Sequence, residues 1–100
     1  EAARRLRAGP SLIQREVTLN NVLGLHARAA ARFVQVASRF RSRISLSKDG
    51  RSVDAKSILG ILMLAGAQGD RLVLSAQGDD EKEAVEALSA LILSRFGETR

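Results

Sequence analysis

The amino-acid sequence predicts an α+β domain built as an open-faced two-layer sandwich, in which three helices cover one face of a four-stranded antiparallel sheet. Three observations lead to this prediction. Short stretches alternate apolar and polar residues with a period of two, which is typical of half-buried strands. Longer stretches repeat apolar residues at helical spacing. The two kinds of segment follow one another in the order β-α-β-β-α-β-α, which favours helices packed on one face of a sheet.

Composition indicates a small globular domain with an aliphatic core. The 100 residues are 45% hydrophobic but only 3% aromatic, so Leu, Ile, Val and Ala must fill the interior. The chain has no cysteine and a single histidine, which excludes disulfides, thiolate metal sites and a His-rich metal cluster, and we expect no cofactor. No apolar run approaches the ~20 residues that span a bilayer. We therefore expect no membrane insertion and a cytoplasmic location.

The first part of the chain predicts an extension, a strand, a turn and a long helix. Gly9-Pro10 would end any helix formed before them, so we expect residues 1–11 to be a flexible N-terminal extension and residues 12–100 to form the domain. Residues 13–19 alternate and predict a strand, and Gly24 allows a bend after it. Helical spacing predicts a helix over residues 27–40. Its expected buried stripe is Ala27, Ala30, Ala31, Val34, Ala37 and Ser38, and its expected outer face is Arg28, Arg32, Gln35 and Arg39.

The middle of the chain predicts a β-hairpin. Residues 41–47 alternate, with Ile44 and Leu46 facing inward. Asp49-Gly50 is a strong signal for a two-residue hairpin turn. Residues 51–55 then complete the hairpin as the third strand.

Two further helices and a strand complete the order. Ser57 stands at an N-cap position before the apolar run 58–64, a short helix that we expect to end in the glycine-rich stretch 66–69 and to bury Met63 and Leu64. Residues 70–76 predict the fourth strand. The last helix is expected to begin at residues 79–80, two aspartates favoured there by the helix dipole, and to close at Phe96-Gly97. Its expected core residues are Ala84, Val85, Leu88, Leu91 and Ile92.

The strongest candidate site is His26, which stands between the predicted first strand and first helix. The first N–H groups of a helix have no intrahelical acceptor and lie at the positive end of its dipole, an arrangement that suits phosphate. An imidazole in this position can carry a phosphoryl group on a ring nitrogen. The backbone N–H groups of Ala27 and Arg28 would hold the phosphoryl oxygens, and the Arg28 side chain would add positive charge. The simpler alternative, a histidine that only fills a turn, is disfavoured by the glycine before it and the arginine after it.

Two motifs about thirty residues apart carry a resemblance to a known family. The first is Leu25-His26-Ala27-Arg28 followed by an Ala-rich amphipathic helix. The second is Lys56-Ser57-Ile58-Leu59-Gly60-Ile61-Leu62. With the length and the element order, these motifs resemble HPr, the histidine phosphocarrier of the bacterial phosphotransferase system, over roughly residues 13 to 97. The resemblance implies the same four-stranded sheet covered by three helices.

The resemblance also implies a function and partners. A member of this family is a phosphocarrier that forms a phosphohistidine and is not a free-standing enzyme. His26 would accept a phosphoryl group from phosphorylated enzyme I and pass it to the A components of enzyme II complexes in phosphoenolpyruvate-dependent sugar transport. Ser57 matches the regulatory serine that HPr kinase/phosphorylase modifies in some bacteria. One position departs from the family pattern, because Ala29 stands where the family usually has proline; we expect an active but less rigid site.

The second motif also predicts a docking surface. Its helix is apolar on more than one side, so some of its side chains should remain exposed beside His26 and form a transient protein interface. The expected interface residues are Ala31, Arg32, Ile58, Leu59 and Leu62. We expect the chain to be a monomer.

Three alternatives share parts of this pattern. A regulatory paralogue in the nitrogen-related phosphotransferase branch would use the same histidine. A degenerate relative would act only through Ser57, which retention of His26 disfavours. The net charge of +5 also suits a nucleic-acid-binding module, but such a module would display aromatic residues on its strands, and the three phenylalanines, residues 33, 40 and 96, all fall in or beside predicted helices. We therefore expect no nucleic-acid partner.

Overall fold

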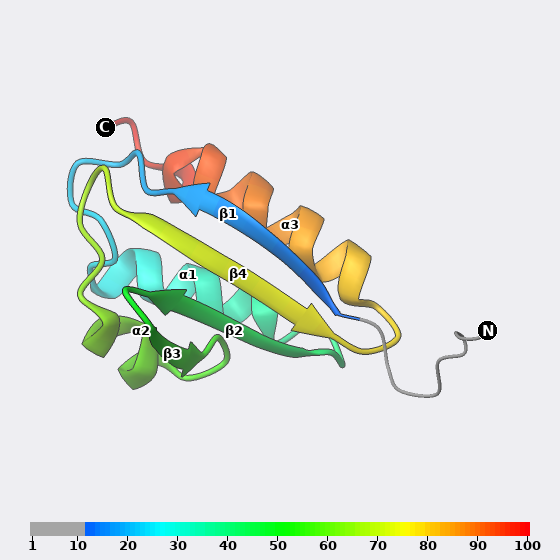
Figure 1. Cartoon of the computed structure of the whole chain (residues 1–100). Helices are drawn as coiled ribbons and strands as arrows, with labels where there is room; N and C mark the ends of the chain where they lie inside the picture. The colour runs from blue at the N-terminus through cyan, green and yellow to red at the C-terminus, as the bar shows by residue number, and fades with distance from the viewer. Residues whose placement is uncertain (1–11) are drawn as a thin grey trace.

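Four antiparallel strands form one sheet in the spatial order β1-β4-β2-β3 (Figure 1). The computed structural model describes residues 12–100, so the extension predicted for residues 1–11 lies outside the described part. The strands are β1 (Ile13–Thr18), β2 (Arg43–Lys48), β3 (Arg51–Asp54) and β4 (Arg71–Gln77). Their bounds lie within two residues of the predicted ones. Because β4 pairs with both β1 and β2, the last strand in the chain is central in the sheet.

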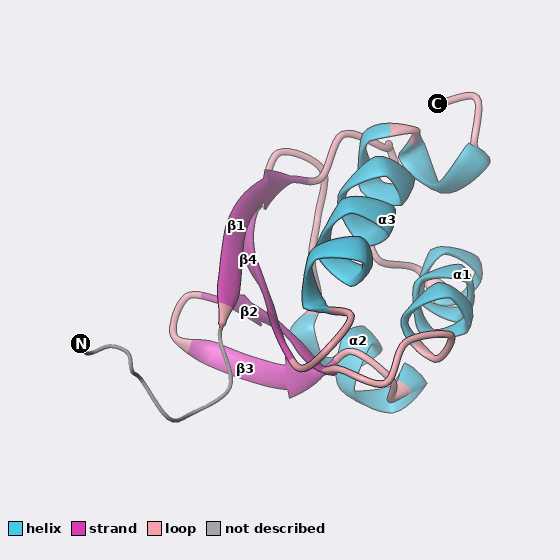
Figure 2. Ribbon diagram, turned by 90° about the vertical axis from the view of Figure 1, so that its right-hand side faces the viewer, coloured by secondary structure: helices cyan, strands magenta, loops and turns pink. Residues whose placement is uncertain are grey.

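All the helices lie on one face of this sheet (Figure 2). They are α1 (Ala27–Ala37), α2 (Ile58–Leu64) and α3 (Glu81–Leu93), and a short 3-10 turn, η1 (Arg95–Gly97), follows α3. The open-faced two-layer sandwich and the order β-α-β-β-α-β-α are thus confirmed. Figure 1 places the start of α1, the end of α2 and the C-terminus at the same end of the molecule.

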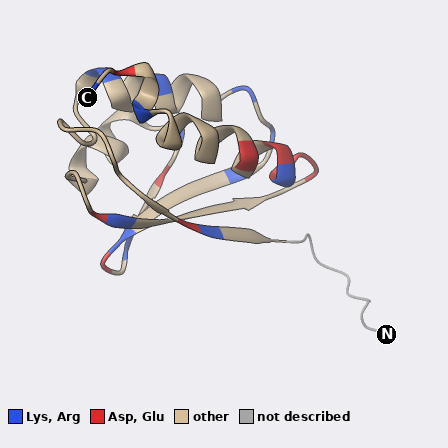
Figure 3. Cartoon of the chain, turned by 90° about the horizontal axis from the view of Figure 1, so that it is seen from above, with Lys and Arg blue, Asp and Glu red and all other residues tan. Residues whose placement is uncertain are grey.

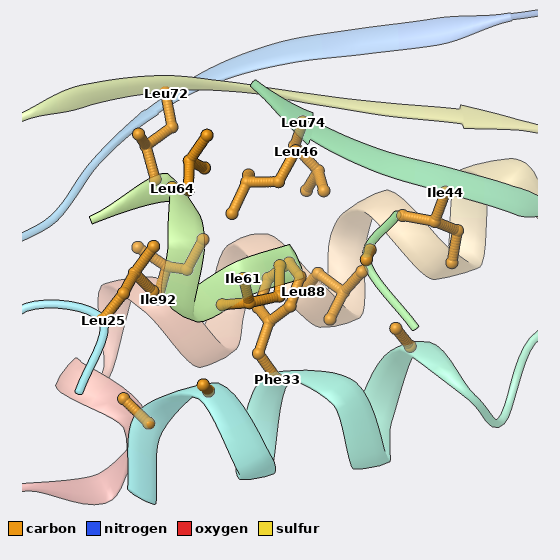
Figure 4. Packing of buried hydrophobic residues seen from close by; sticks show 14 of the residues in the cluster. Leu25, Phe33, Ile44, Leu46, Ile61, Leu64, Leu72, Leu74, Leu88 and Ile92 are labelled. Atoms are coloured by element: carbon orange, nitrogen blue, oxygen red, sulfur yellow. The ribbon is translucent and has the colours of Figure 1, made fainter. Parts of the chain in front are cut away.

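The core lies between the sheet and the helices and is almost entirely aliphatic. Phe33 of α1 reaches toward Ile61 of α2 and Leu88 of α3 (Figure 4). Burial alternates along β2 and β4, and Ile44 and Leu46 are buried as predicted. In α3, four of the five predicted core residues are buried and the fifth, Leu91, is partly buried against them.

The prediction for α1 was wrong in two respects. The helix ends at Ala37, and its buried residues are Ala29, Ala30, Phe33 and Ala37, whereas the predicted stripe included the exposed residues Ala27 and Ser38. The reason is the small size of alanine. In an alanine-rich helix several faces look equally apolar, and the large side chain of Phe33 decides which face enters the core. The predicted outer face of three arginines and one glutamine is exposed.

The ends of the short elements follow backbone geometry. Asp49 and Gly50 both have positive φ, 51° and 82°, as the predicted two-residue hairpin turn requires. Helix α2 ends earlier than predicted, because Ala65 and not a glycine adopts the left-handed C-cap conformation. Met63 was predicted to be buried but is 63% exposed, while Leu64 is buried as expected. A seven-residue helix makes only two turns, so its inward face is narrow and leaves most of its apolar side chains exposed.

Candidate functional site

His26 is the N-cap residue of α1 and stands at the end of a tightly fixed loop. Its backbone is extended, with φ −77° and ψ 177°, and its carbonyl accepts the first helical bond from Ala30 N at 2.8 Å. The preceding residue, Leu25, donates its N–H to Gly66 O at 2.9 Å. Gly24 has φ 62°, and a Cβ there would lie 2.4 Å from the same Gly66 oxygen. The glycine predicted to allow the bend is therefore required by both backbone conformation and space.

The first turn of α1 presents backbone donors beside the imidazole. The N–H groups of Ala27, Arg28 and Ala29 precede the first intrahelical bond, which is made by Ala30, so the helix supplies no acceptor for them. The His26 side chain does not cap them. Ala27 and Arg28 are exposed, whereas Ala29 is fully buried. The two residues whose N–H groups are predicted to hold a phosphoryl group are thus exposed, and they directly follow a half-buried histidine.

An open groove brings this histidine together with three arginines. The arginines are Arg28 and Arg32 of α1 and Arg100 at the end of the chain, and the other lining residues are Val22, Leu23, Gly97, Glu98 and Thr99. The Arg32 guanidinium also donates a hydrogen bond to the Phe96 carbonyl, which fixes η1 against α1. The groove is therefore rich in cationic side chains. It is formed by two segments that are far apart in the sequence, residues 22–32 and residues 97–100. It suits an anion larger than a halide, such as a phosphoryl group.

One carboxylate also reaches the histidine. Glu98 Oε2 lies 2.5 Å from His26 Nε2, and Glu98 Oε1 accepts a hydrogen bond from Asn21 Nδ2 at 3.0 Å. The same Asn21 amide donates to Gly24 O at 2.9 Å, within the loop that leads to His26. Neither Asn21 nor Glu98 was predicted from the sequence to be a site residue. They lie 77 positions apart, and no local periodicity indicates that the chain end returns to this loop.

Hydrogen bonding keeps this carboxylate ionised. Burial alone would raise the pKa of Glu98, but hydrogen bonds from Asn21 and His26, with the nearby positive charge of Arg28, outweigh it and hold the pKa below its ordinary value. Glu98 is thus an acceptor at neutral pH. Any proton shared with His26 resides on the ring nitrogen.

Ser57 is the N-cap of α2, as predicted. Its Oγ accepts a hydrogen bond from Gly60 N at 3.0 Å, and its side chain is half-buried. It lies about one length of α2 away from the Leu25–Gly66 contact, roughly 10 Å for seven residues. The second sequence motif therefore begins about one helix length from the loop that leads to His26.

The predicted docking residues of α2 are exposed. Leu59 is 68% exposed, Ile58 45% and Leu62 37%, and Met63 joins them although it was predicted to be buried. Of the two predicted residues of α1, Arg32 is exposed and Ala31 is half-buried. Val22 and Leu23, in the His26 loop, are exposed as well. Exposed apolar side chains therefore occur both on α2 and in the loop that leads to His26, and the latter line one groove with arginines. Figure 3 places acidic residues in the first turn of α3, which includes Glu81 and Glu83.

Two features are absent from residues 12–100. That part of the chain contains no cluster of three or more His, Asp or Glu residues that could hold a metal ion. None of its helices combines the length and the apolar character needed to cross a bilayer.

The positions of the aromatic residues bear on the nucleic-acid-binding alternative. All three phenylalanines belong to helices or to the segments that follow them, so no aromatic side chain stands on a strand to stack a base.

Known proteins resemble this chain in sequence and in fold. Residues 13–94 match the family model described as the PTS HPr component phosphorylation site. The chain is 52% identical over 87 residues to the phosphocarrier protein HPr of Cupriavidus necator, which covers 87% of this chain and 98% of that protein. A crystal structure of HPr from Thermoanaerobacter tengcongensis superposes with a TM-score of 0.85 at 51% identity, covering 88% of this chain and 99% of the other. A structure of an HPr dimer from the same organism superposes with a TM-score of 0.71 at 55% identity, covering 82% and 94%.

Proposed function

This chain belongs to the HPr family of phosphocarrier proteins of the phosphotransferase system, and from that premise we propose that His26 is its phosphoryl-carrying residue. The observation that carries the proposal is the position of the single histidine. It is half-buried at the start of α1, next to backbone donors that the helix does not use and in one groove with three arginines.

The proposed reaction is a reversible transfer between proteins. The lone pair of a His26 ring nitrogen forms a bond to phosphorus, while the bond between phosphorus and the donor breaks and its electron pair stays on the donor. The backbone N–H groups of Ala27 and Arg28 hold the phosphoryl oxygens and the Arg28 guanidinium offsets their charge. By its family, the donor is phosphorylated enzyme I and the acceptors are the A components of enzyme II complexes. The chain is then a co-substrate of those enzymes and not itself an enzyme.

Openness of the site supports a carrier role. A carrier must release its phosphoryl group as readily as it accepts it, so the site should stabilise the group only moderately and leave it accessible. His26 retains 26% of its side-chain exposure, and its groove is open to solvent. A deep and closed anion site would favour retention over transfer.

Incubation of the chain with enzyme I and labelled phosphoenolpyruvate tests this proposal. We expect the label to be acid-labile and to be absent from the His26→Ala variant. A variant of the exposed Arg39, Arg39→Ala, serves as the control because it removes a surface side chain beyond the end of α1. Label that is acid-stable, or that survives in His26→Ala, would contradict the proposal.

We further propose that phosphorylation of Ser57 regulates docking. A phosphoserine would add about two negative charges at the start of α2, next to the exposed residues Ile58 and Leu59. Its oxygens could still accept the Gly60 N–H, so the helix need not unfold. The charge would instead repel an acidic partner from the docking surface.

The Ser57→Asp variant tests this regulation. We expect phosphotransfer from enzyme I to slow by about tenfold while the fold is retained, with Ser57→Ala as the matched control. Ser57→Ala loses the cap and about 1 kcal/mol of stability but adds no charge. An unchanged rate for Ser57→Asp would refute the inhibitory role.

A further inference from the structure

The loop that leads to His26 is held at both of its ends by one short turn. This turn, residues 66–70, lies between α2 and β4, and Figure 1 shows it beside the loop that connects β1 to α1. At the start of the loop, Leu19 makes two backbone hydrogen bonds with the turn, of 3.0 and 2.8 Å. At its end, Leu25 N donates to Gly66 O at 2.9 Å. The position of the turn therefore sets the backbone that precedes the histidine.

The Gly66 carbonyl and the Ala67 N–H belong to one peptide group, and both have partners. The carbonyl accepts from Leu25 N, and the N–H donates to Asp70 Oδ2 at 2.8 Å. Because the N–H and C=O of a trans peptide point in opposite directions in one plane, the carboxylate that holds the N–H also directs the carbonyl. A hydrogen bond at the N–H further polarises the carbonyl as an acceptor. Asp70 is thus connected to Leu25 through one planar unit.

Lys48, at the end of β2, holds this carboxylate. Its Nζ lies 2.9 Å from the same Asp70 Oδ2 and donates to Ala65 O at 3.2 Å, in the peptide group just before Gly66. The hydrogen bond from Ala67 N, and then that from Lys48, holds the pKa of Asp70 below its ordinary value, so the carboxylate is ionised at neutral pH. The two side chains together hold the peptide groups on both sides of the Gly66 α-carbon.

Close packing also links the turn to the loop. A Cβ at Gly66 would lie 2.7 Å from Leu19 Cδ1 and 2.8 Å from Leu25 Cδ1, so the bare backbone of the turn packs against these two buried side chains. Gly24 likewise approaches the Gly66 oxygen too closely for any side chain. Interiors packed in this way transmit a displacement from one segment to the next. A shift of the turn therefore moves the residues directly before His26.

We propose that Asp70 and Lys48 are positioning residues for His26, which orient the peptide group that holds the preceding residue and so fix the imidazole relative to the backbone donors at the start of α1. This inference rests on the proposed function of His26. Neither side chain contacts the phosphoryl group, and neither belongs to the proposed docking surface. Loss of the pair should therefore affect the transfer step and not the encounter with enzyme I.

Five substitutions separate the contact from charge and from general stability. Asp70→Ala removes the acceptor of the Ala67 N–H. Asp70→Asn keeps an oxygen that can accept this N–H but loses the ion pair, so it should preserve part of the effect. Lys48→Met removes the cation. The controls are Asp79→Ala, at an exposed aspartate before α3, and Arg51→Met, which removes a cation of the same hairpin that donates to a different carbonyl of α2.

Hydrogen exchange of the Leu25 amide in the full, unphosphorylated chain measures the contact directly. Local opening exposes this N–H, whereas a general loss of stability also speeds exchange at Leu74 in the central strand. We expect the Leu25 rate, relative to that of Leu74, to rise about tenfold in Asp70→Ala, less in Asp70→Asn and Lys48→Met, and not in the controls. Dispersed amide spectra show that each variant is folded. An unchanged ratio in Asp70→Ala overturns the proposal.

Phosphotransfer from enzyme I tests whether this contact positions the histidine. At saturating concentrations of the chain, we expect the rate to fall about fivefold in Asp70→Ala with KM unchanged, to be intermediate in Asp70→Asn, and to be unchanged in both controls. The double variant Lys48→Met, Asp70→Ala should be no slower than Asp70→Ala, because the two side chains act as one unit. Losses that add in the double variant, or a change in KM alone, would overturn the positioning role.

The two measurements also separate this inference from the function on which it rests. If the starting chain accepts phosphate on His26 but the Asp70 variants transfer it at the control rate, the role of the ion pair is wrong and the carrier function stands. If Leu25 shows the expected exchange pattern but the starting chain accepts no phosphate, the carrier function is refuted and the positioning role with it.

Discussion

Ala29 is fully buried in the first turn of α1, at the position where the family usually has proline. Its N–H precedes the first intrahelical bond, so proline would remove no helical hydrogen bond there. Proline would also restrict the unfolded chain. We therefore expect the alanine to leave the site functional but less constrained.

We predict that Ala29→Pro retains phosphotransfer and raises stability by about 0.4–1 kcal/mol, because the loss of freedom falls mainly on the unfolded state. Phosphotransfer from enzyme I and chemical unfolding would measure the two effects. If the starting chain accepts no phosphate and Ala29→Pro restores it, then alanine is not tolerated. If the proline variant folds but loses activity, the Ala29 N–H is itself needed for the phosphoryl group.

At the residue scale, the sequence pattern singled out His26 as the candidate but did not indicate which distant residues contact it. His26 was predicted because a helix start, a glycine and an arginine are all local signals. Glu98 lies beyond the last periodic segment, and its contacts with Asn21 and His26 depend on how the chain end folds over α1. Contacts between residues so far apart in the sequence produce no periodic pattern. They are found only in the folded structure, where the end of the chain lies beside the loop before α1.

Asp80 connects two elements at the level of helices and strands. It was predicted to begin α3, and it is the N-cap residue, but its carboxylate does not cap its own helix. It accepts hydrogen bonds from Ser42 Oγ, Arg41 N and Ser42 N, in the segment before β2. These bonds, chiefly that of the Ser42 hydroxyl, lower the pKa of Asp80 to about 2.

We predict an acid-dependent loss of stability from this contact. The pKa is lower in the folded chain than in the unfolded one, where an aspartate titrates near its ordinary value of ~3.9. The stabilisation is therefore complete above about pH 4 and is lost as the pH falls toward 2. Thermal unfolding from about pH 2 to 6 should show a smaller pH dependence in Asp80→Asn than in the matched variant of its exposed neighbour, Asp79→Asn. Equal slopes for the two variants would show that the contact does not form.

Ala65 has the left-handed conformation that ends α2, with φ 57°. This conformation costs an L-residue roughly 1–2 kcal/mol relative to its usual backbone, whereas glycine adopts it freely. We predict that Ala65→Gly stabilises the chain by about 0.5–1 kcal/mol, measured by urea unfolding. The side chain is exposed, so little packing is lost. If Ala65→Gly destabilises the chain, residue 65 does not end α2 in the left-handed conformation.

Whether an element could be predicted depended on how distinct its faces are. The strands were placed within two residues because a period of two separates inner and outer side chains clearly. Ser57 and the apolar run after it indicated where α2 lies. They did not indicate which side of the helix faces the core, and Met63 was wrongly predicted to be buried. In α1, alanines on several faces hid the dominant role of Phe33. Pattern therefore fails where polarity is uniform around an element.

For the whole molecule, the fold gathers the proposed site and the proposed docking surface at one end (Figure 1). The loop before His26 is bonded to Gly66, just after α2, so the exposed side chains of α2 lie on the same side as the histidine. Exposed apolar side chains occur elsewhere too, as at Leu12. This residue directly precedes β1, and β1 begins at the other end of the molecule (Figure 1). Exposure alone therefore does not identify an interface. The exposed side chains of α2 differ from Leu12 in that they lie at the same end of the molecule as His26.

We predict that Leu59→Ser slows phosphotransfer from enzyme I by about tenfold, while Leu12→Ser leaves the rate unchanged. Leu59 is 68% exposed and Leu12 55%, so both substitutions remove a surface side chain and should change the free energy of unfolding by only about 0.5 kcal/mol. A residue at the centre of a docking surface contributes more than about 1 kcal/mol to binding, and the slower rate should accordingly appear at low concentrations of the chain and disappear at saturation. Initial rates at several concentrations would show this pattern. Equal rates for the two variants would place the docking surface elsewhere, and a rate that stays low at saturation would show that Leu59 affects the transfer step and not the encounter.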